Sequence, residues 1–254
     1  MQTSSPYQPI ENYGIIGDLS TTALVGMDGS IDFMCFPDFD SPTIFAAMLD
    51  HEKGGRFKIA PKMNGTRKKQ MYLPNTNVLI SRFLSEDGVA EITDFMPVEE
   101  DGNTITHELV RQVTTVRGEV EYELTCWPQF NYARSSHQVQ PTDQGVYFFS
   151  EGPDELKLFL RSSVPLQVSE KGAATARFRL KAGEKAFFVL EKFHPYRESP
   201  SLSPGFVPEA FRRTVNYWRM WVRKSQYKGR WREMVNRSAL TLKLLTSQKY
   251  GSIV

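Results

Sequence analysis

The sequence is poor in cysteine and has no long apolar run, and both absences restrict what the protein can be. Only Cys35 and Cys126 occur in 254 residues, and each lies in an apolar stretch typical of a strand. We therefore expect two free, buried thiols rather than a disulfide. No segment approaches the roughly 18 consecutive apolar residues that a membrane helix needs. The start, MQTSSPYQPIENYG, lacks a basic beginning and an apolar core, so we expect no secretory signal, no membrane partner and a cytoplasmic location.

Motifs for metals and nucleotides are also missing. The cysteines are isolated, and no metal-ligand spacing relates the four histidines, which are His51, His107, His137 and His194. Neither GxGxxG nor GxxxxGK[ST] occurs in the chain. We therefore predict no metal site and no cofactor.

The charges that are present are unevenly distributed. Residues 1–209 contain 20 Lys/Arg and 28 Asp/Glu, whereas residues 210–254 contain 11 Lys/Arg and a single Glu. Basic residues interleaved with aromatic ones, such as Trp218 and Trp231, are one way to bind nucleic acid. The continuous apolar stripe in the same segment is better explained by helices with one buried face. We therefore predict no nucleic-acid partner.

The middle of the chain has the pattern of an antiparallel sandwich. From Arg56 to Lys192, short β-rich runs follow one another, and several alternate strictly, as in Glu121-Tyr122-Glu123-Leu124. Turn-forming residues such as Arg117-Gly118 separate them. Regular strand spacing without intervening helices predicts a mainly β domain, an antiparallel β-sandwich over residues 1–192.

The stretch Tyr13–Leu49 contains the sharpest local signals. Thr21–Val25 and Ile31–Phe36 are strand-like, and Asp28-Gly29 between them supplies the positive φ angles of a hairpin turn. After Phe36 comes PDFDSP, in which Ser41 has the chemistry of an N-cap and Pro42 that of a first helical residue. Apolar residues at helical spacing then predict a helix from about Thr43 to Asp50.

Further carboxylates in and after this stretch have expected structural roles. Asp28 should be a turn residue, and Asp32 should lie on the polar face of its strand. Asp18 and Asp94 are expected to accept hydrogen bonds from nearby backbone, as short turn-forming side chains do.

The composition changes after residue 192. Four prolines and three serines in FHPYRESPSLSPGFVP indicate a linker over residues 193–207. Two helices are predicted next, Pro208–Tyr227, ended by Lys228-Gly229, and Arg230–Ser247. Their apolar stripes contain Phe211, Val215, Trp218 and Val222, and then Met234, Val235, Ala239, Leu242 and Leu245, with Leu240 and Leu244 widening the second stripe. Two such helices alone form an incomplete layer, so either they fold back on the sandwich or the sequence is part of a longer protein. We expect part of their surface to remain uncovered and the fragment to form a homo-oligomer or to have a mobile last helix.

Five motifs resemble those of one enzyme family, and together they span nearly the whole chain. They are IGDLSTTALVGMDGSIDFMCFPDFDSPTIFAAML, GGRFKIAP, DFMP, WPQFNYAR and YKGRWREMVNRSALTLKLLT. They resemble the N-terminal part of trehalase-like and glucoamylase-like proteins of glycoside hydrolase family 15. The resemblance implies a β-sandwich followed by a catalytic α/α barrel of six helical hairpins, in which residues 208–254 would be a linker helix and the first barrel helix.

The resemblance also implies an activity. The intact enzyme would hydrolyse an α-glucosidic bond, in trehalose or malto-oligosaccharides, with inversion. Its two catalytic carboxylates would lie beyond Val254, so we expect no catalytic residue in this chain. Its partners would be the carbohydrate substrate and the protein's own catalytic barrel.

The best candidate for a substrate contact is the pair Asp38 and Asp40 flanking Phe39. Two carboxylates around an aromatic ring can accept hydrogen bonds from sugar hydroxyls while the ring stacks on a pyranose face. The alternative is that Asp40 caps the predicted helix beside Ser41 and that Asp38 is a solvated loop residue. Two other functions stay open from the residues alone: a stand-alone carbohydrate-binding sandwich, and a basic module that binds nucleic acid or a partner protein.

Overall fold

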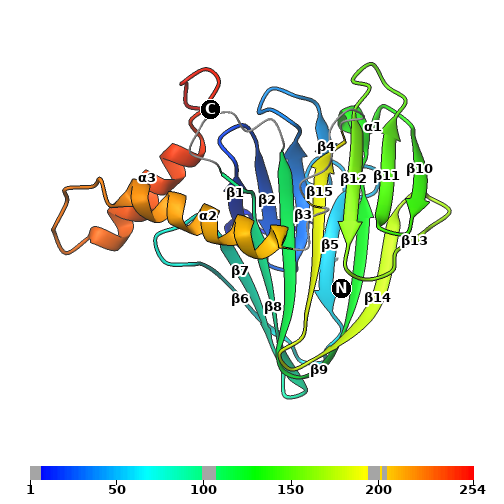
Figure 1. The fold of residues 1–254 in the computed structure, drawn as a ribbon, viewed down its shortest axis with the longest axis horizontal. Helices are drawn as coiled ribbons and strands as arrows, with labels where there is room; N and C mark the ends of the chain where they lie inside the picture. The colour runs from blue at the N-terminus through cyan, green and yellow to red at the C-terminus, as the bar shows by residue number, and fades with distance from the viewer. Residues whose placement is uncertain (1–6, 99–106, 194–200, 202–204) are drawn as a thin grey trace, which may run out of the picture.

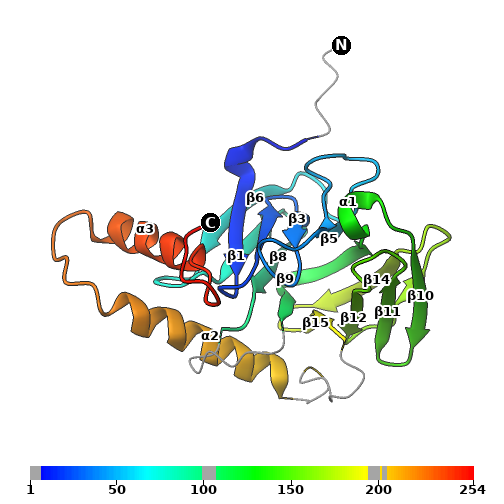
Figure 2. The ribbon, with the colours of Figure 1, turned by 90° about the horizontal axis from the view of Figure 1, so that it is seen from above.

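The protein is a β-sandwich with two helices packed on its outside (Figures 1 and 2). The computed structural model describes residues 7–98, 107–193, 201 and 205–254. One sheet contains β1 (Tyr13–Gly17), β2 (Thr22–Gly26), β3 (Ser30–Cys35), β4 (Thr43–Phe45), β5 (Arg56–Pro61), β13 (Gln167–Val168) and β14 (Ala174–Lys181). The other contains β6 (Arg67–Tyr72), β7 (Leu79–Leu84), β8 (Gly88–Phe95), β10 (His137–Thr142), β11 (Gly145–Ser150), β12 (Lys157–Ser162) and β15 (Lys185–Lys192). These strands pair antiparallel throughout, which confirms the predicted fold class.

One long strand, β9 (Glu108–Trp127), belongs to both sheets. Its first half pairs with β8 and β15, and its second half pairs with β5 and β14. The strand changes sheets at Gly118, whose φ of +80° is open to glycine at little cost. A Cβ at this position would lie 2.4 Å from the backbone oxygen of Asp87. The crossing therefore depends on a residue without a side chain.

The main hydrophobic core fills the space between the two sheets. Both sheets contribute fully buried side chains, among them Phe57, Leu124, Ile92, Leu109 and Phe188. The strict alternation seen in the sequence explains this arrangement, because alternate residues of a strand point to opposite faces.

The predicted β2–β3 hairpin is confirmed. Its turn ends at Gly29, which has a φ of +83°. Asp28 is the turn residue expected from the sequence, since its Oδ1 accepts hydrogen bonds from the backbone N–H and the hydroxyl of Ser30. A Cβ on Gly29 would lie 2.1 Å from the backbone oxygen of Ile59, so both the backbone angle and the close approach require glycine here.

The helix predicted from Thr43 to Asp50 is wrong. Residues 43–45 form β4, which pairs antiparallel with the end of β3, and a turn follows it. Ile44 and Phe45 are buried in the core, and the backbone oxygen of Ile44 accepts from the N–H of Gln129. Pairing with β3 and burial of these side chains outweigh the weak local preference for a helix. Neither Ser41 nor Asp40 is therefore a helix cap.

Helix α2 (Phe206–Val222) covers the outside of the β7–β8–β9–β15 region, and a second helix packs beside it. Helix α2 buries Phe206, Val207, Ala210 and Val215 against Val78, Phe95, Val110 and Val189. Its second half and α3 (Arg232–Leu244) pack with the sandwich around Trp218, Leu240 and Leu244. The helices thus fold back on the sandwich. More than half of the surface remains exposed for Trp231, which precedes α3, and for Met234 and Leu242 on α3.

Both helices were predicted, but their limits and one face differ. Helix α2 ends at Val222, five residues before the predicted end, so Gly229 does not cap it. Residues 223–234 are all exposed, and a helix end without buried contacts is weakly held. On α3 the buried face contains Asn236 together with Leu240 and Leu244, which were predicted at the edge of the stripe. Met234 and Leu242, which were predicted within the stripe, face outward.

The division into domains at residues 192 and 207 stays a prediction. Strand β15 ends at Lys192 and α2 begins at Phe206, but most of the predicted linker, 193–207, lies outside the described residues. No helix in the described ranges is long and apolar enough to cross a membrane.

Candidate functional site

The candidate residues Asp38, Phe39 and Asp40 lie in the loop between β3 and β4. The peptide bond before Pro37 is cis. Inside the loop, the N–H of Asp38 donates to Oγ of Ser41, and the N–H of Ser41 donates to the backbone oxygen of Asp38, each at 3.1 Å. Ser41 therefore closes the loop instead of starting a helix. In the part of the chain that the structure describes, neither the carboxylate of Asp38 nor that of Asp40 has a hydrogen-bond or ion-pair partner.

A second segment, residues 245–254 after α3, approaches this loop. It is held by backbone bonds from Ser247 to Ser252 and from Val254 to Leu245. The N–H of Gln248 also donates to the backbone oxygen of Leu19 at 2.8 Å. The segment is therefore tied to the turn between β1 and β2, and its end lies beside these strands in both views (Figures 1 and 2).

Helix α3 is itself fixed to the sandwich at the turn between β6 and β7. The guanidinium of Arg237 lies 4.0 Å over the ring of Tyr72 and donates to the backbone oxygen of Thr76 and to Oδ1 of Asn77. The side-chain N–H of Asn77 donates in turn to the backbone oxygen of Leu240 at 3.2 Å. These contacts fix the position from which the segment 245–254 leaves the helix.

The loop and the segment line an open hollow of about 270 Å³. Its lining combines carboxylates, hydroxyls and aromatic rings, from Ser20, Asp38, Phe39, Asp40, Ser247, Tyr250, Ser252 and Val254. Aromatic surface beside a few polar groups is the usual make-up of a small-molecule site. The structure thus brings the three predicted residues together at one hollow, with Tyr250 added from a segment 210 positions later in the chain.

The amine of Lys249 adds a positive charge beside the hollow. It lies 4.9 Å from the centre of the Tyr250 ring. A hydrogen bond to Tyr250, together with the negative charges of Asp38 and Asp40, raises the pKa of Lys249. The rim of the hollow therefore contains both hydrogen-bond acceptors and a donor.

The turn between β1 and β2 forms the base of the hollow, where Ser20 is one of the lining residues. Oδ1 of Asp18 accepts from the N–H groups of Ser20 and Thr21 at 2.9 Å each, which confirms its predicted role as a turn former. Its other oxygen lies 2.7 Å from Nδ1 of His107. The imidazole packs edge-on against Phe36, the residue that starts the loop. The sequence contains no signal for this contact, because 89 positions separate the two partners.

The Asp18 contact affects the charge of His107. Burial alone disfavours the imidazolium, but the hydrogen bond and the negative charge of Asp18, reinforced by Asp38 and Glu108, outweigh it and raise the pKa of His107. His107 therefore stabilises the base of the hollow most strongly when it is protonated.

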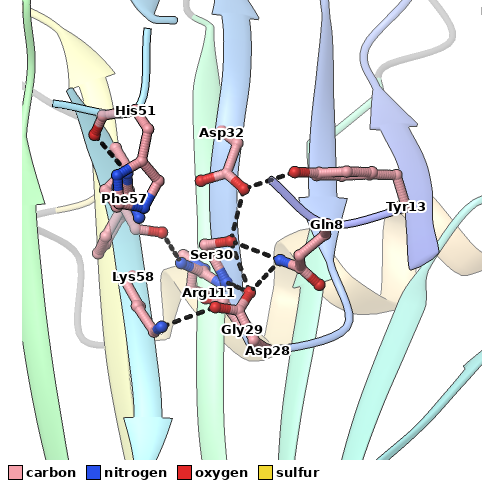
Figure 3. A network of polar contacts seen from close by, with 11 residues as sticks. Gln8, Tyr13, Asp28, Gly29, Ser30, Asp32, His51, Phe57, Lys58 and Arg111 are labelled. Atoms are coloured by element: carbon pink, nitrogen blue, oxygen red, sulfur yellow. Dashed lines mark hydrogen bonds and ion pairs between the residues drawn. The ribbon is translucent and has the colours of Figure 1, made fainter. Parts of the chain in front are cut away.

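A separate polar network lies at the β2–β3 hairpin (Figure 3). Asp32, expected on a polar face, is only 6% exposed, and its Oδ2 accepts from the hydroxyls of Tyr13 and Ser30. Burial disfavours ionisation of Asp28, but hydrogen bonds and the charge of Lys58 at 2.6 Å outweigh it and lower the pKa of Asp28. Both carboxylates are thus engaged in holding the hairpin together.

The expectation for Asp94 is wrong. Instead of forming a local turn, its Oδ1 accepts from Nε of Arg111 at 2.8 Å, and both side chains are completely buried. The other guanidinium nitrogens of Arg111 donate to the backbone oxygens of Phe57 and Gly29. The pair therefore joins β8 and β9 to the hairpin across the sandwich core.

The remaining candidates for chemistry give no further site. Cys35 and Cys126 are both free, as predicted, and burial raises the pKa of each thiol. In the described ranges, no group of three or more His, Cys, Asp or Glu residues is placed to hold a metal ion.

Comparison with known proteins identifies the family. Residues 3–195 match the family described as "Trehalase-like, N-terminal". The chain belongs to this family. The resemblance to trehalase-like and glucoamylase-like proteins that the motifs suggested is therefore confirmed, for the whole sandwich.

Curated relatives of this trehalase-like domain are much longer proteins. A trehalase of Thermoplasma volcanium is 30% identical over 255 residues, which cover 99% of this chain and 40% of the relative. A trehalase of Mycolicibacterium smegmatis is 30% identical over 275 residues, covering 98% of this chain and 40% of the relative. The chain thus spans about 40% of the length of these two relatives.

A solved structure shares the fold. A bacterial glucoamylase in complex with acarbose superposes with a TM-score of 0.60 over 92% of this chain and 40% of its own, at 11% identity. At this identity the likeness concerns the fold only. The role of Asp38, Phe39 and Asp40 in the trehalase-like domain stays a prediction.

Proposed function

We propose that this chain is the N-terminal, non-catalytic part of a glycoside hydrolase that cleaves an α-glucosidic bond, in trehalose or malto-oligosaccharides. Family membership and the trehalase relatives support this proposal. Hydrolysis would proceed with inversion, which requires one carboxylic acid to protonate the leaving oxygen and one carboxylate to activate water. Both would come from a catalytic barrel beyond Val254, and the protein would act in the cytoplasm.

Within that enzyme, the β3–β4 loop would form part of the rim of the sugar site. The observation that carries this role is the convergence of the loop with the segment after α3 at one hollow. The carboxylates of Asp38 and Asp40 are unpaired among the described residues and can accept from sugar hydroxyls, and Phe39 and Tyr250 offer aromatic surface. If the barrel begins with α3, this hollow lies where sandwich and barrel meet.

Steady-state kinetics of the natural protein on trehalose tests the rim role. Phe39→Ala and Asp38→Asn should raise KM, because they remove contacts to the substrate outside the reacting bond. The matched control is Tyr132→Ala, which removes a half-exposed aromatic ring from the four-residue segment α1 (Phe130–Ala133); Tyr132 is not among the residues that line the hollow. Unchanged KM in both loop variants, or an equal change in the control, would refute the rim role.

A stand-alone carbohydrate-binding sandwich is the second candidate. The same hollow favours it, because residues of this chain alone line it. Saturation binding of trehalose and maltose to the 254-residue chain separates the two. A binding module keeps its affinity when isolated, whereas a rim that completes a larger site binds too weakly to saturate.

A further inference from the structure

A basic groove lies between the end of α2 and the start of α3, away from the hollow described above. It measures about 400 Å³ and is lined by Pro74, Asn75, Arg219, Val222, Arg223, Ser225, Arg232 and Asn236. The two helices that form it lie side by side in both views (Figures 1 and 2). From the sandwich side, the turn between β6 and β7 closes the groove with Pro74 and Asn75.

Three guanidinium groups dominate this groove. Arg219 and Arg223 are one turn apart on α2 and thus lie on the same face of the helix. Arg232 is the first residue of α3, whose N-cap, Trp231, makes no capping hydrogen bond with its side chain. The free backbone N–H groups at this helix start add positive potential to that of the arginines.

The three arginines have no counter-ion in the part of the chain that the structure describes. From Arg219 to Arg232 the sequence contains six basic residues and no acidic one. Like charges four residues apart destabilise a helix, so the cluster has a cost that packing does not explain. Earlier on the same helix, Arg212 and Arg213 do have a carboxylate partner in Glu209.

The base of the groove is rigid. Val222 and Asn236 are both more than nine-tenths buried, and the side-chain N–H of Asn236 donates to Oδ1 of Asn75 at 3.1 Å. This bond connects α3 to the β6–β7 turn. Around this base, the exposed side chains of Arg219, Arg223 and Arg232 line one concave surface.

We propose that this groove binds a phosphoryl group, either free inorganic phosphate or the phosphate of a phosphorylated sugar. Guanidinium groups match the geometry of phosphate oxygens and form paired, charge-assisted hydrogen bonds with them. Three such groups around one concave surface can surround a compact dianion. The volume of the groove, about 400 Å³, suits a small molecule, since ligand pockets measure roughly 300–1,000 Å³. The site is independent of the proposed glycosidase function and gives a role to three of the eleven basic residues in 210–254.

Isothermal titration of inorganic phosphate into the 254-residue chain, with sodium chloride of equal ionic strength as the reference, tests the proposal. Saturable binding is expected, and Arg219→Gln/Arg223→Gln/Arg232→Gln should weaken it by about tenfold or more. The matched control, Arg212→Gln/Arg213→Gln, removes two charges from the same helix and should bind as the wild type does. The single variant Arg232→Gln serves if the triple variant does not fold.

Glucose 6-phosphate and glucose, titrated separately, distinguish the two sources of the phosphoryl group. Tighter binding of glucose 6-phosphate than of phosphate, without binding of glucose, indicates a sugar phosphate; equal binding indicates free phosphate. The proposal is overturned if phosphate does not saturate, if the arginine variants bind it unchanged, or if the control loses as much affinity. Saturable binding of a single-stranded oligonucleotide without binding of phosphate would also overturn it.

Discussion

Gly29→Ala should destabilise the sandwich by about 2.5–5 kcal/mol. A non-glycine residue in the left-handed region costs about 1–2 kcal/mol, and the added Cβ would lie 2.1 Å from the backbone oxygen of Ile59. The turn must therefore move. The backbone oxygen of Gly29 accepts from the N–H of Ile59 at 3.1 Å and from Nη2 of Arg111 at 2.8 Å. Weakening the bond to the buried guanidinium adds roughly 1.5–3 kcal/mol.

Gly183→Ala is the matched control for this variant. Gly183 has a φ of +88°, close to that of Gly29, but nothing lies within 4 Å of the position its Cβ would take. Gly183→Ala should therefore lower the free energy of unfolding only by the cost of placing a non-glycine residue in the left-handed region, about 1–2 kcal/mol. Urea denaturation measures both variants, with an unchanged slope expected if each unfolds in two states. Equal losses for Gly29→Ala and Gly183→Ala would refute the role assigned to the Arg111 contact and the close approach.

Three further predictions concern buried and exposed groups. Asp94→Leu should lower the free energy of unfolding by about 3–5 kcal/mol, because it leaves the buried guanidinium of Arg111 unpaired. Adding Arg111→Met should recover part of this loss in urea titrations. A double variant that is less stable than Asp94→Leu alone would contradict this prediction. Since the folded-state pKa of His107 is raised, its stabilising contribution is full below its unfolded pKa of about 6.5 and is lost as pH rises through the folded pKa. The stability difference between wild type and His107→Gln should therefore shrink with rising pH, and a difference that grows would refute the ion pair with Asp18. Leu240→Ala should cost about 2–5 kcal/mol, whereas Leu242→Lys should leave stability within about 0.5 kcal/mol and reduce self-association in sedimentation; a wild-type chain that stays monomeric at all concentrations would contradict the uncovered face.

Much of the fold follows from local sequence. Alternating strands need only neighbouring residues to show which face is buried, and Asp28-Gly29 specifies its hairpin through the φ values that the turn demands. The two terminal helices were predicted from their spacing of apolar residues. Local reasoning was insufficient where partners are distant. Thr43–Phe45 became a strand because β3 offers an edge to pair with, and no cap signal could reveal that edge.

The candidate site divides in the same way. Asp38, Phe39 and Asp40 were predicted as candidates because carboxylates around an aromatic ring stand out within three residues, and their role stays a prediction. Their neighbour Tyr250 and the ion pair of His107 with Asp18 were missed, since only the folded chain brings these positions together. The buried pair of Asp94 and Arg111 was missed for another reason. A carboxylate at a strand end before proline has the local pattern of a turn, and its burial depends on the opposite sheet.

Release of glucose from trehalose tests the proposed function most directly. It should be measured for the protein purified from its natural source and, side by side, for the 254-residue chain. We predict hydrolysis with inversion by the natural protein and no turnover above a buffer control by the 254-residue chain. Turnover by the 254-residue chain that is abolished by Asp38→Asn or Asp40→Asn would contradict this prediction and place the catalytic groups in the sandwich itself.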